Sequence, residues 1–241
     1  MKRMTKLYLK GIGYDKSRND TAFPFNLSIL SDIDQLIFDA PVTYLIGENG
    51  SGKSTIIETI AGLMDLNLEG GSKNNFFVSY EEQLALIEAC YPIKYPEYPK
   101  DSYFYRAESY YNLMTEIEHI DHGMGVFERE LHTYSRGESF FELASSRFFG
   151  NGFYLLDEPE TGLSLSTQLQ FMILMQDLIK SNSQFVIATH SPILLFFPNA
   201  RIYEFTNGKI VKRQLEETTI YQEWSMIFER KAHFFQKLFE T

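Results

Sequence analysis

The chain has 241 residues and carries 22 Lys and Arg against 32 Asp and Glu, which gives a formal net charge of −10 at pH 7. This length suits one sizeable α/β domain, because single hydrophobic cores stop growing near ~250–300 residues. The acidic balance argues against a protein that coats DNA by bulk electrostatics, although it still allows a local basic groove.

The cysteine content and the lack of long apolar runs favour a cytoplasmic protein. Cys90 is the single cysteine, so the sequence excludes an internal disulfide and fits a reducing compartment. No stretch approaches the ~18–20 consecutive apolar residues that span a bilayer. Residues 1–6 also lack the apolar run of a signal peptide. We therefore expect a cytoplasmic protein without a membrane segment.

The first part of the chain predicts an antiparallel flank beside an α/β core. Residues 5–12 alternate between apolar and polar side chains, and residues 23–29 form a second strand-like segment after a polar loop. The apolar run 42–46 predicts a buried strand. In residues 54–64 apolar side chains recur at helical spacing, so we expect a helix there.

Residues 70–134 predict an insertion with helices of its own. Within it we expect helices at 81–90 and 110–120, and residues 102–109 indicate a strand that runs into the second helix. Three prolines within residues 91–99 predict a surface loop without regular structure.

Two further strands are predicted to lie at the centre of the sheet. A helix over residues 135–149 precedes them, and Ser135 with Glu138 three residues on forms a capping-box pattern at its start. Residues 153–157 are an apolar run that closes on acidic side chains, and residues 183–190 repeat the scheme with a polar end. Such runs are typical of parallel strands that deliver polar side chains to their carboxyl ends.

The C-terminal part predicts a helix, a hairpin and an apolar tail. The helix at 165–180 lies between the two central strands in sequence. Residues 201–205 and 209–212 flank an Asn-Gly dipeptide, which favours a tight hairpin turn. Residues 221–239 are helix-like and too apolar to remain in water, so we expect them either to pack on the body or to contact a partner.

The complete pattern G-x-x-x-x-G-K-[ST] lies between the predicted strand at 42–46 and the helix that follows. Its glycines let successive backbone N–H groups approach phosphate oxygens at the start of that helix. Lys53 supplies positive charge for the β- and γ-phosphates, and the Ser54 hydroxyl suits Mg²⁺. The predicted nucleotide-binding residues are Gly47, Glu48, Asn49, Gly50, Ser51, Gly52, Lys53, Ser54 and Thr55.

Two other predicted strands end on polar side chains at the same edge of the sheet. Asp157 and Glu158 end one strand, and His190 ends the other. Asp157 and Ser54 are the predicted metal ligands, because Mg²⁺ prefers few carboxylates and several waters. Glu158 and His190 are the predicted catalytic residues: Glu158 would polarise the attacking water, and His190 would sense or stabilise the γ-phosphate. A structural role for His190 remains open.

The order of these motifs resembles the ABC-type P-loop ATPases, in particular SMC-like and DNA-repair ATPase heads and a group of small stand-alone bacterial AAA-family ATPases. Residues 47–55 look like Walker A, residues 153–158 like Walker B with its adjacent catalytic glutamate, and residues 189–191 like the switch histidine. The resemblance implies ATP and Mg²⁺ as ligands and hydrolysis of ATP to ADP and phosphate.

The same resemblance implies a fold. It is an α/β P-loop NTPase fold of the ABC-ATPase type, with a central mainly parallel sheet, an antiparallel flank and a helical insertion. The chain would form a single ABC-type ATPase domain over residues 1–241, with the insertion at 70–134 and the signature helix at 135–149.

The segment S-R-G-E-S occupies the place of the family's signature motif. The resemblance implies that this segment contacts the ATP of a second subunit, so that ATP induces a head-to-tail homodimer. A serine hydroxyl and free N–H groups at a helix start suit an anion. The residues that would act in trans are Ser135, Arg136, Gly137 and Glu138. Glu108 is the candidate for the Q-loop position, and Tyr14 and Phe23 remain alternatives for the aromatic side chain that stacks on adenine.

Departures from the transporter pattern bear on the biological role. The signature is S-R-G-E-S rather than L-S-G-G-Q, and Ser164 stands where transporters usually carry aspartate. We therefore expect an ATP-dependent switch that acts on a protein partner, in DNA-related work or anti-phage defence, with direct nucleic-acid binding left open. The alternatives are a regulatory nucleotide-binding subunit with little hydrolysis and the ATPase subunit of a transporter.

Overall fold

The computed structural model of the chain describes residues 5–17, 25–26, 28–32, 34–68, 81–108 and 136–239. The elements of the first half are β1 (Leu9–Tyr14), α1 (Ser28–Asp32), β2 (Gln35–Ile37), β3 (Val42–Gly47), α2 (Lys53–Leu63), α3 (Glu81–Ala89), β4 (Cys90–Lys94) and β5 (Asp101–Arg106). Those of the second half are α5 (Arg136–Arg147), β6 (Gly152–Asp157), α6 (Leu165–Lys180), β7 (Gln184–Ala188), β8 (Arg201–Thr206), β9 (Lys209–Arg213), α7 (Thr219–Glu229) and α8 (Lys231–Phe239).

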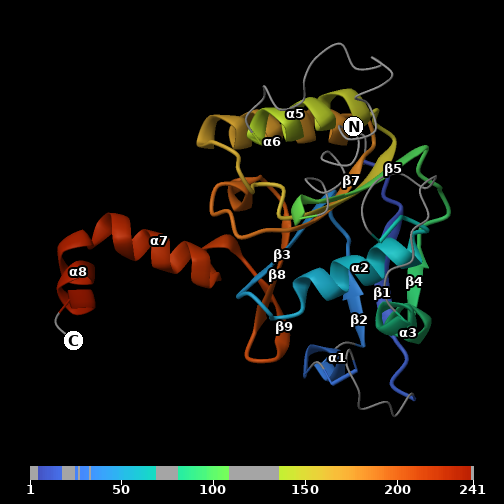
Figure 1. Cartoon of the computed structure of the whole chain (residues 1–241), viewed down its shortest axis with the longest axis horizontal. Coiled ribbons are helices and arrows are strands. Elements are labelled where there is room, and N and C mark those ends of the chain that lie inside the picture. Colours follow the sequence, from blue (N-terminus) through green and yellow to red (C-terminus); the bar gives the residue numbers. More distant parts are fainter. Residues whose placement is uncertain are drawn as a thin grey trace, which may run out of the picture.

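A six-stranded sheet forms the centre of the molecule, with the strand order β5-β6-β7-β3-β8-β9 (Figure 1). Its strands are parallel except for β9, which forms the predicted Asn-Gly hairpin with β8. Ala188 at the end of β7 pairs with Leu45 of β3 on one side and with Asp157 of β6 on the other. The ends of β3, β6 and β7 therefore lie at one edge of the sheet, as the sequence predicts.

Alternate residues of the central strands enter two separate cores, one on each face of the sheet. Leu45 packs with α2 and with the three-stranded sheet described below. Its neighbours Tyr44 and Ile46 pack with α5 and α6 on the opposite face. Figure 1 shows this layering, with α5 and α6 on one side and α2 on the other. Because both faces are covered, the central strands are mostly apolar rather than alternating.

The predicted antiparallel flank is a three-stranded sheet of order β2-β1-β4. Gln184 of β7, which is fully buried, connects this sheet to the central one. Its side-chain oxygen accepts hydrogen bonds from the backbone N–H groups of Tyr8 and Leu9 at 2.8 and 2.9 Å. Its amide nitrogen donates to the Leu9 carbonyl at 2.7 Å.

Two local predictions are wrong. Residues 91–99 were expected to lack regular structure, yet β4 includes Pro92, which pairs with Ile12. Because β4 lies at the edge of its sheet, the missing N–H of Pro92 does not break the sheet. Residues 23–29 were expected to be a strand, but a short helix begins at Ser28. Consecutive Ile29 and Leu30 are both buried, which a strand covered on one face cannot achieve.

The range predicted as a helical insertion is only partly described. Its described portion contains α3, as predicted, but β4 belongs to the three-stranded sheet and β5 is an edge strand of the central sheet. Residues 81–106 are therefore part of the body, because their strands complete both sheets. The helix expected at 110–120 and Ser135 lie outside the described residues. A single domain over residues 1–241 stays a prediction.

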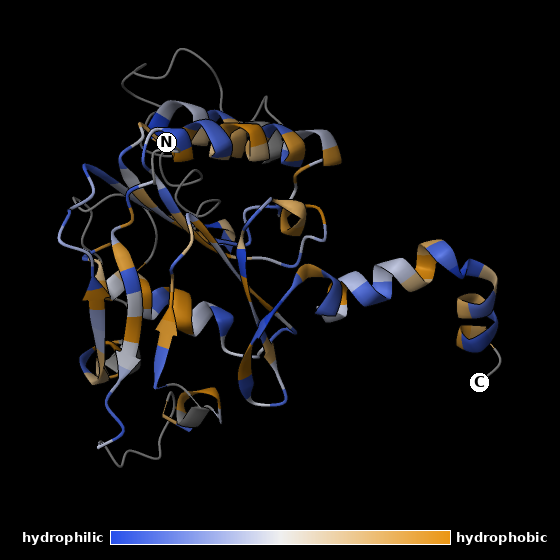
Figure 2. Ribbon diagram, turned by 180° about the vertical axis from the view of Figure 1, so that it is seen from behind, coloured by the Kyte–Doolittle hydropathy of each residue, from blue (hydrophilic) through white to orange (hydrophobic). Residues whose placement is uncertain are grey.

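The C-terminal helices α7 and α8 extend away from the rest of the chain (Figure 1). Neither helix has a buried residue. Of the two outcomes expected for residues 221–239, packing on the body is seen at the start of α7, where the Tyr221 ring lies 6.2 Å from that of Phe196, while the remainder extends away. Figure 2 shows hydrophobic segments along both helices, far from either core. Within the described ranges, no helix has the length and apolarity to span a membrane.

Candidate functional site

The predicted phosphate loop connects β3 to α2. Gly52 immediately precedes α2 with φ 97°, a left-handed conformation that glycine adopts without strain, and it offers no side chain to cap the helix. A Cβ atom at Gly47 would lie 2.5 Å from the carbonyl oxygen of Phe205, so only glycine fits between the loop and β8. The start of α2 is thus free of a capping side chain, an arrangement that suits an anion.

Lys53 is the first residue of α2, and its side chain turns back over the loop. The ammonium group donates hydrogen bonds to the carbonyl oxygens of Gly47 and Glu48, both at 2.9 Å. Burial lowers the pKa of Lys53, and the carboxylates of Glu158, Asp157 and Glu160 oppose this shift. A buried cation is therefore held at the loop between backbone carbonyls and three acidic side chains.

Asp157, the last residue of β6, is 6% exposed and lies beside the phosphate loop. Burial raises its pKa to about 6; Arg106 opposes the shift, Glu158 adds to it, and a hydrogen bond from Ser54 also opposes it. Its Oδ1 atom has no hydrogen-bond partner among the described residues. A buried carboxylate oxygen without a partner, next to a serine hydroxyl, fits the ligand chemistry of Mg²⁺.

Glu158 follows β6 in a strained backbone conformation. Its φ of 51° is uncommon for a residue other than glycine, and such strain often occurs at functional sites. The backbone N–H donates to the carbonyl oxygen of Ala188 at 2.9 Å, so β7 holds this conformation. The side chain is 43% exposed, and its Oε1 lies 3.7 Å from Nε2 of His190. The predicted general base therefore reaches water and the predicted switch histidine.

Glu160 also belongs to this site, although it was not among the residues predicted from the sequence. Its Oε1 accepts the backbone N–H of His190 at 2.6 Å, and burial raises its pKa. Burial, together with Lys53, lowers the pKa of His190, while Glu158 raises it. His190 is thus neutral near pH 7, and Glu160 fixes its backbone. The third acidic residue in D-E-P-E was the only sequence signal for this role.

The structure places the other predicted residues as follows. Arg136, Gly137 and Glu138 form the first turn of α5, whereas Ser135 and Phe23 lie outside the described residues. Tyr14 is half-buried at the end of β1. The Glu108 side chain is 82% exposed and lies 3.5 Å from Arg106, which makes a shorter ion pair of 2.8 Å with Glu58.

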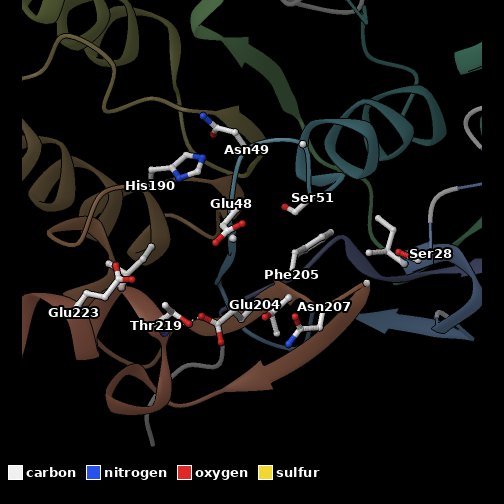
Figure 3. Close-up of a pocket in the computed structure, with 16 residues that line it drawn as sticks. Ser28, Glu48, Asn49, Ser51, His190, Glu204, Phe205, Asn207, Thr219 and Glu223 are labelled. Carbon is white, nitrogen blue, oxygen red and sulfur yellow. Dashed lines mark hydrogen bonds between the residues drawn. The ribbon is translucent and has the colours of Figure 1, made fainter. Parts of the chain in front are cut away.

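A cavity of about 530 Å³ lies to one side of the phosphate loop. Figure 3 shows that Glu48, Asn49 and Ser51 of the loop face Thr219 and Glu223 of α7 across it. Its volume is in the range of small-ligand sites. Neither Lys53 nor Asp157 lines it, although the structure describes both, so this cavity flanks the phosphate site rather than containing it.

The burial of Asp157 should make the free energy of unfolding depend on pH. Because its pKa of about 6 exceeds the ordinary 3.8, the folded chain binds the proton more tightly, and the ionised carboxylate destabilises the fold at neutral pH. We expect Asp157→Asn to raise the free energy of unfolding by on the order of 3 kcal/mol at pH 7 and by about half as much at pH 5. The gain should vanish below about pH 4. Urea unfolding with EDTA and without nucleotide measures it.

The exposed Asp177, which pairs with Lys180 at 2.8 Å, provides a matched control. Asp177→Asn should change the free energy of unfolding by less than about 0.5 kcal/mol. If the Asp157→Asn chain were less stable than the wild type at pH 7, burial of the ionised Asp157 carboxylate would not destabilise the fold.

Comparisons with known proteins agree with this arrangement. A family model described as "AAA domain, putative AbiEii toxin, Type IV TA system" matches residues 127–195, a range that includes α5, β6, α6 and β7. A relative from Sulfurisphaera tokodaii, named "Putative ABC transporter ATP-binding protein", is 22% identical over 214 residues, covering 79% of this chain and 42% of the relative. The zinc import ATP-binding protein ZnuC of Buchnera aphidicola is 30% identical over 151 residues, covering 61% and 60%.

These matches span less than two thirds of the length of either relative. The SMC head domain from Thermotoga maritima is a similar solved structure, with a TM-score of 0.44, 19% identity and coverage of 86% of this chain and 100% of that one. The phosphate loop between β3 and α2, with the acidic strand end of β6 beside it, agrees with these matches, and the chain is similar in sequence to ATP-binding proteins of the ABC type.

Proposed function

We propose that the chain binds ATP with Mg²⁺, hydrolyses it in a head-to-tail homodimer, and acts in the cytoplasm as a switch on a partner protein. The observation that carries the proposal is the convergence of Lys53, Asp157 and Glu158 at the phosphate loop. Their charges meet there because β3 and β6 end at one edge of the sheet. This edge is where open α/β folds bind their ligands.

Each side chain has a role that its surroundings support. Lys53 and the N–H groups at the start of α2 would hold the β- and γ-phosphates. Ser54 and Asp157 would hold Mg²⁺, which when bound would offset the charge of the phosphate oxygens. Glu158 would take a proton from the attacking water, since it reaches solvent. Neutral His190, 3.7 Å away, would orient that carboxylate or the γ-phosphate.

In the proposed dimer, the signature segment of one chain would lie at the ATP site of the other chain. Helix α5, 12 residues long, begins at Arg136 within this segment. A helix start rich in small and polar residues suits the γ-phosphate. In this arrangement the phosphate loop of one chain and the α5 start of the other form one composite site.

Mixing two inactive variants tests the composite site. Lys53→Ala removes the cation of the phosphate loop, and Gly137→Asp places a negative charge at the start of α5. Each variant alone should lose at least ~100-fold in ATP turnover. In an equal mixture half of the dimers are mixed, and each keeps one intact site, so about a quarter of the wild-type turnover should return.

The control replaces the Lys53→Ala chain by the double variant Lys53→Ala/Gly137→Asp. Mixed dimers then have no intact site, so turnover should stay at the level of the single variants. If the first mixture also shows no recovery, two chains do not share an ATP site.

The names of the relatives favour a second candidate, the ATPase subunit of an ABC transporter. Ser164 and the S-R-G-E-S segment depart from the transporter pattern, which supports the switch instead. Co-purification with a membrane-spanning subunit would decide for the transporter. DNA-related work and anti-phage defence are the settings proposed for the switch, and a regulatory nucleotide-binding subunit with little hydrolysis is the other alternative to it.

A further inference from the structure

The hairpin of α7 and α8, residues 219–239, is attached at the candidate site and extends into solvent. The N–H of Thr219, the first residue of α7, donates to Oε1 of Glu204 at 2.8 Å. Glu204 is 3% exposed and also accepts a hydrogen bond from Arg213 at 3.1 Å. Thr219 and Glu223 line the cavity beside the phosphate loop. The base of the hairpin is therefore fixed, while the remainder extends away (Figures 1 and 2).

Both helices carry aromatic side chains that neither core covers. On α7, Trp224 and Phe228 are one turn apart, with ring centroids 5.4 Å apart, and are 44% and 73% exposed. On α8, Phe235 and Phe239 have the same spacing, with stacked rings 5.7 Å apart, and Phe239 is 75% exposed. Residues at this spacing lie on one face of a helix. Each helix therefore presents one aromatic face.

The two helices of one hairpin do not bury each other. A hollow of about 420 Å³, lined in part by Met226, Phe234 and Leu238, lies between them. Leu238 is 53% exposed and Met226 is 48% exposed. Exposed apolar surface of this extent on a small helical element marks a contact site rather than a solvated surface.

The charges of the two helices are opposite. Helix α7 carries Glu223 and Glu229 and no Lys or Arg, whereas α8 carries Lys231 and Lys237 and no acidic residue. All four side chains belong to exposed residues. No ion pair between described residues joins α7 to α8 within one chain. An acidic helix and a basic helix, each with exposed aromatic side chains, thus belong to the same chain.

We propose that this hairpin binds the hairpin of a second copy of the chain, with α7 of each copy along α8 of the other. In a two-fold pairing the aromatic side chains of α7 in one copy face those of α8 in the other, and the two glutamates of α7 approach the two lysines of α8. The same contact is made twice, because the two copies are related by symmetry. The reverse pairing, α7 against α7, would oppose like charges. Because the acidic helix and the basic helix belong to one sequence, a second copy of the chain is the partner that offers both complementary surfaces.

The contact differs from the ATP-dependent interface, because it uses residues 219–239 and needs no nucleotide. Once two chains are joined through their hairpins, their ATP sites would come together within one complex, so the effective concentration of each site for the other would be high. The proposal does not rest on hydrolysis, and every chain in its test carries Lys53→Ala, so an ATP-dependent dimer does not contribute.

The test measures self-association of the full-length chain by sedimentation equilibrium without nucleotide. We expect a dimer. Glu223→Lys/Glu229→Lys makes both helices basic, and Lys231→Glu/Lys237→Glu makes both acidic. Each double variant alone should self-associate at least about tenfold more weakly. Mixed in equal amounts, the two should form a heterodimer, because each basic helix then meets an acidic one.

Lys209→Glu/Lys212→Glu on β9 changes the net charge as much as the α8 variant does and should leave self-association unchanged. Circular dichroism of each variant checks that the hairpin is still helical. A monomer at concentrations up to about 100 μM would overturn the proposal. So would two double variants that dimerise as strongly as their parent, or that fail to form a heterodimer while remaining folded.

Discussion

Replacing Glu158 by glutamine should lower the ATP hydrolysis rate by roughly 10²–10⁴-fold and leave ATP binding intact, the range expected for loss of a general base. Glutamine has nearly the same shape, so the strained backbone at φ 51° and its hydrogen bond to Ala188 can persist. It cannot accept the proton of the attacking water. The nucleotide should then remain bound before hydrolysis, and the two chains should stay closed around it.

Phosphate release measures the rate of the Glu158→Gln chain, and gel filtration with ATP measures the trapped dimer. The exposed Glu216 offers a control, because Glu216→Gln makes the same chemical change away from the site. A Glu158→Gln chain that hydrolyses ATP at the wild-type rate would show that another group activates the water. One that binds ATP but does not dimerise beyond the nucleotide-free level would contradict the head-to-tail arrangement.

Replacing Lys53 by alanine should weaken ATP binding by at least about 100-fold, since charge-assisted hydrogen bonds to phosphate contribute about 1.5–3 kcal/mol each. The ammonium group already lies at the loop, 2.9 Å from the carbonyl oxygens of Gly47 and Glu48. Without it, Asp157 and Glu158 would face the triphosphate with less opposing charge. Lys53 would therefore both attract the ligand and offset the charge of its acidic neighbours.

Isothermal titration with ATP and Mg²⁺ measures this loss of affinity, and urea unfolding checks that the Lys53→Ala chain is folded. The exposed Lys180 on α6 serves as the matched site, where Lys180→Ala should leave the affinity unchanged. Wild-type affinity in the Lys53→Ala chain would mean that ATP does not bind at this loop.

The helices and strands that were predicted correctly are those whose hydrophobic pattern is complete within a single element. The buried strands β3, β6 and β7 each contain an apolar run, and helix α6 was predicted with its observed bounds, 165–180. The shared edge of these strands followed from a general property of parallel sheets. Local pattern and fold agree here because both faces of the sheet are covered.

The features that the sequence did not predict depend on partners far away in the chain. Pro92 is tolerated because β4 is an edge strand, which only the pairing with β1 reveals. Glu160 contacts the candidate site only because the fold places the N–H of His190, 30 residues on, against its carboxylate. The sequence also did not predict that Arg106, two residues before the exposed Glu108, pairs more closely with Glu58 of α2.

Gln184 links two sheets that could otherwise open independently. It belongs to the central strand β7, yet its side chain satisfies the backbone of Tyr8 and Leu9 at the start of β1. Opening the antiparallel sheet would leave a buried amide without partners, which is costly in an apolar interior. Local fraying of the N-terminal strands is thereby coupled to global unfolding, so the two sheets behave as one cooperative folding unit.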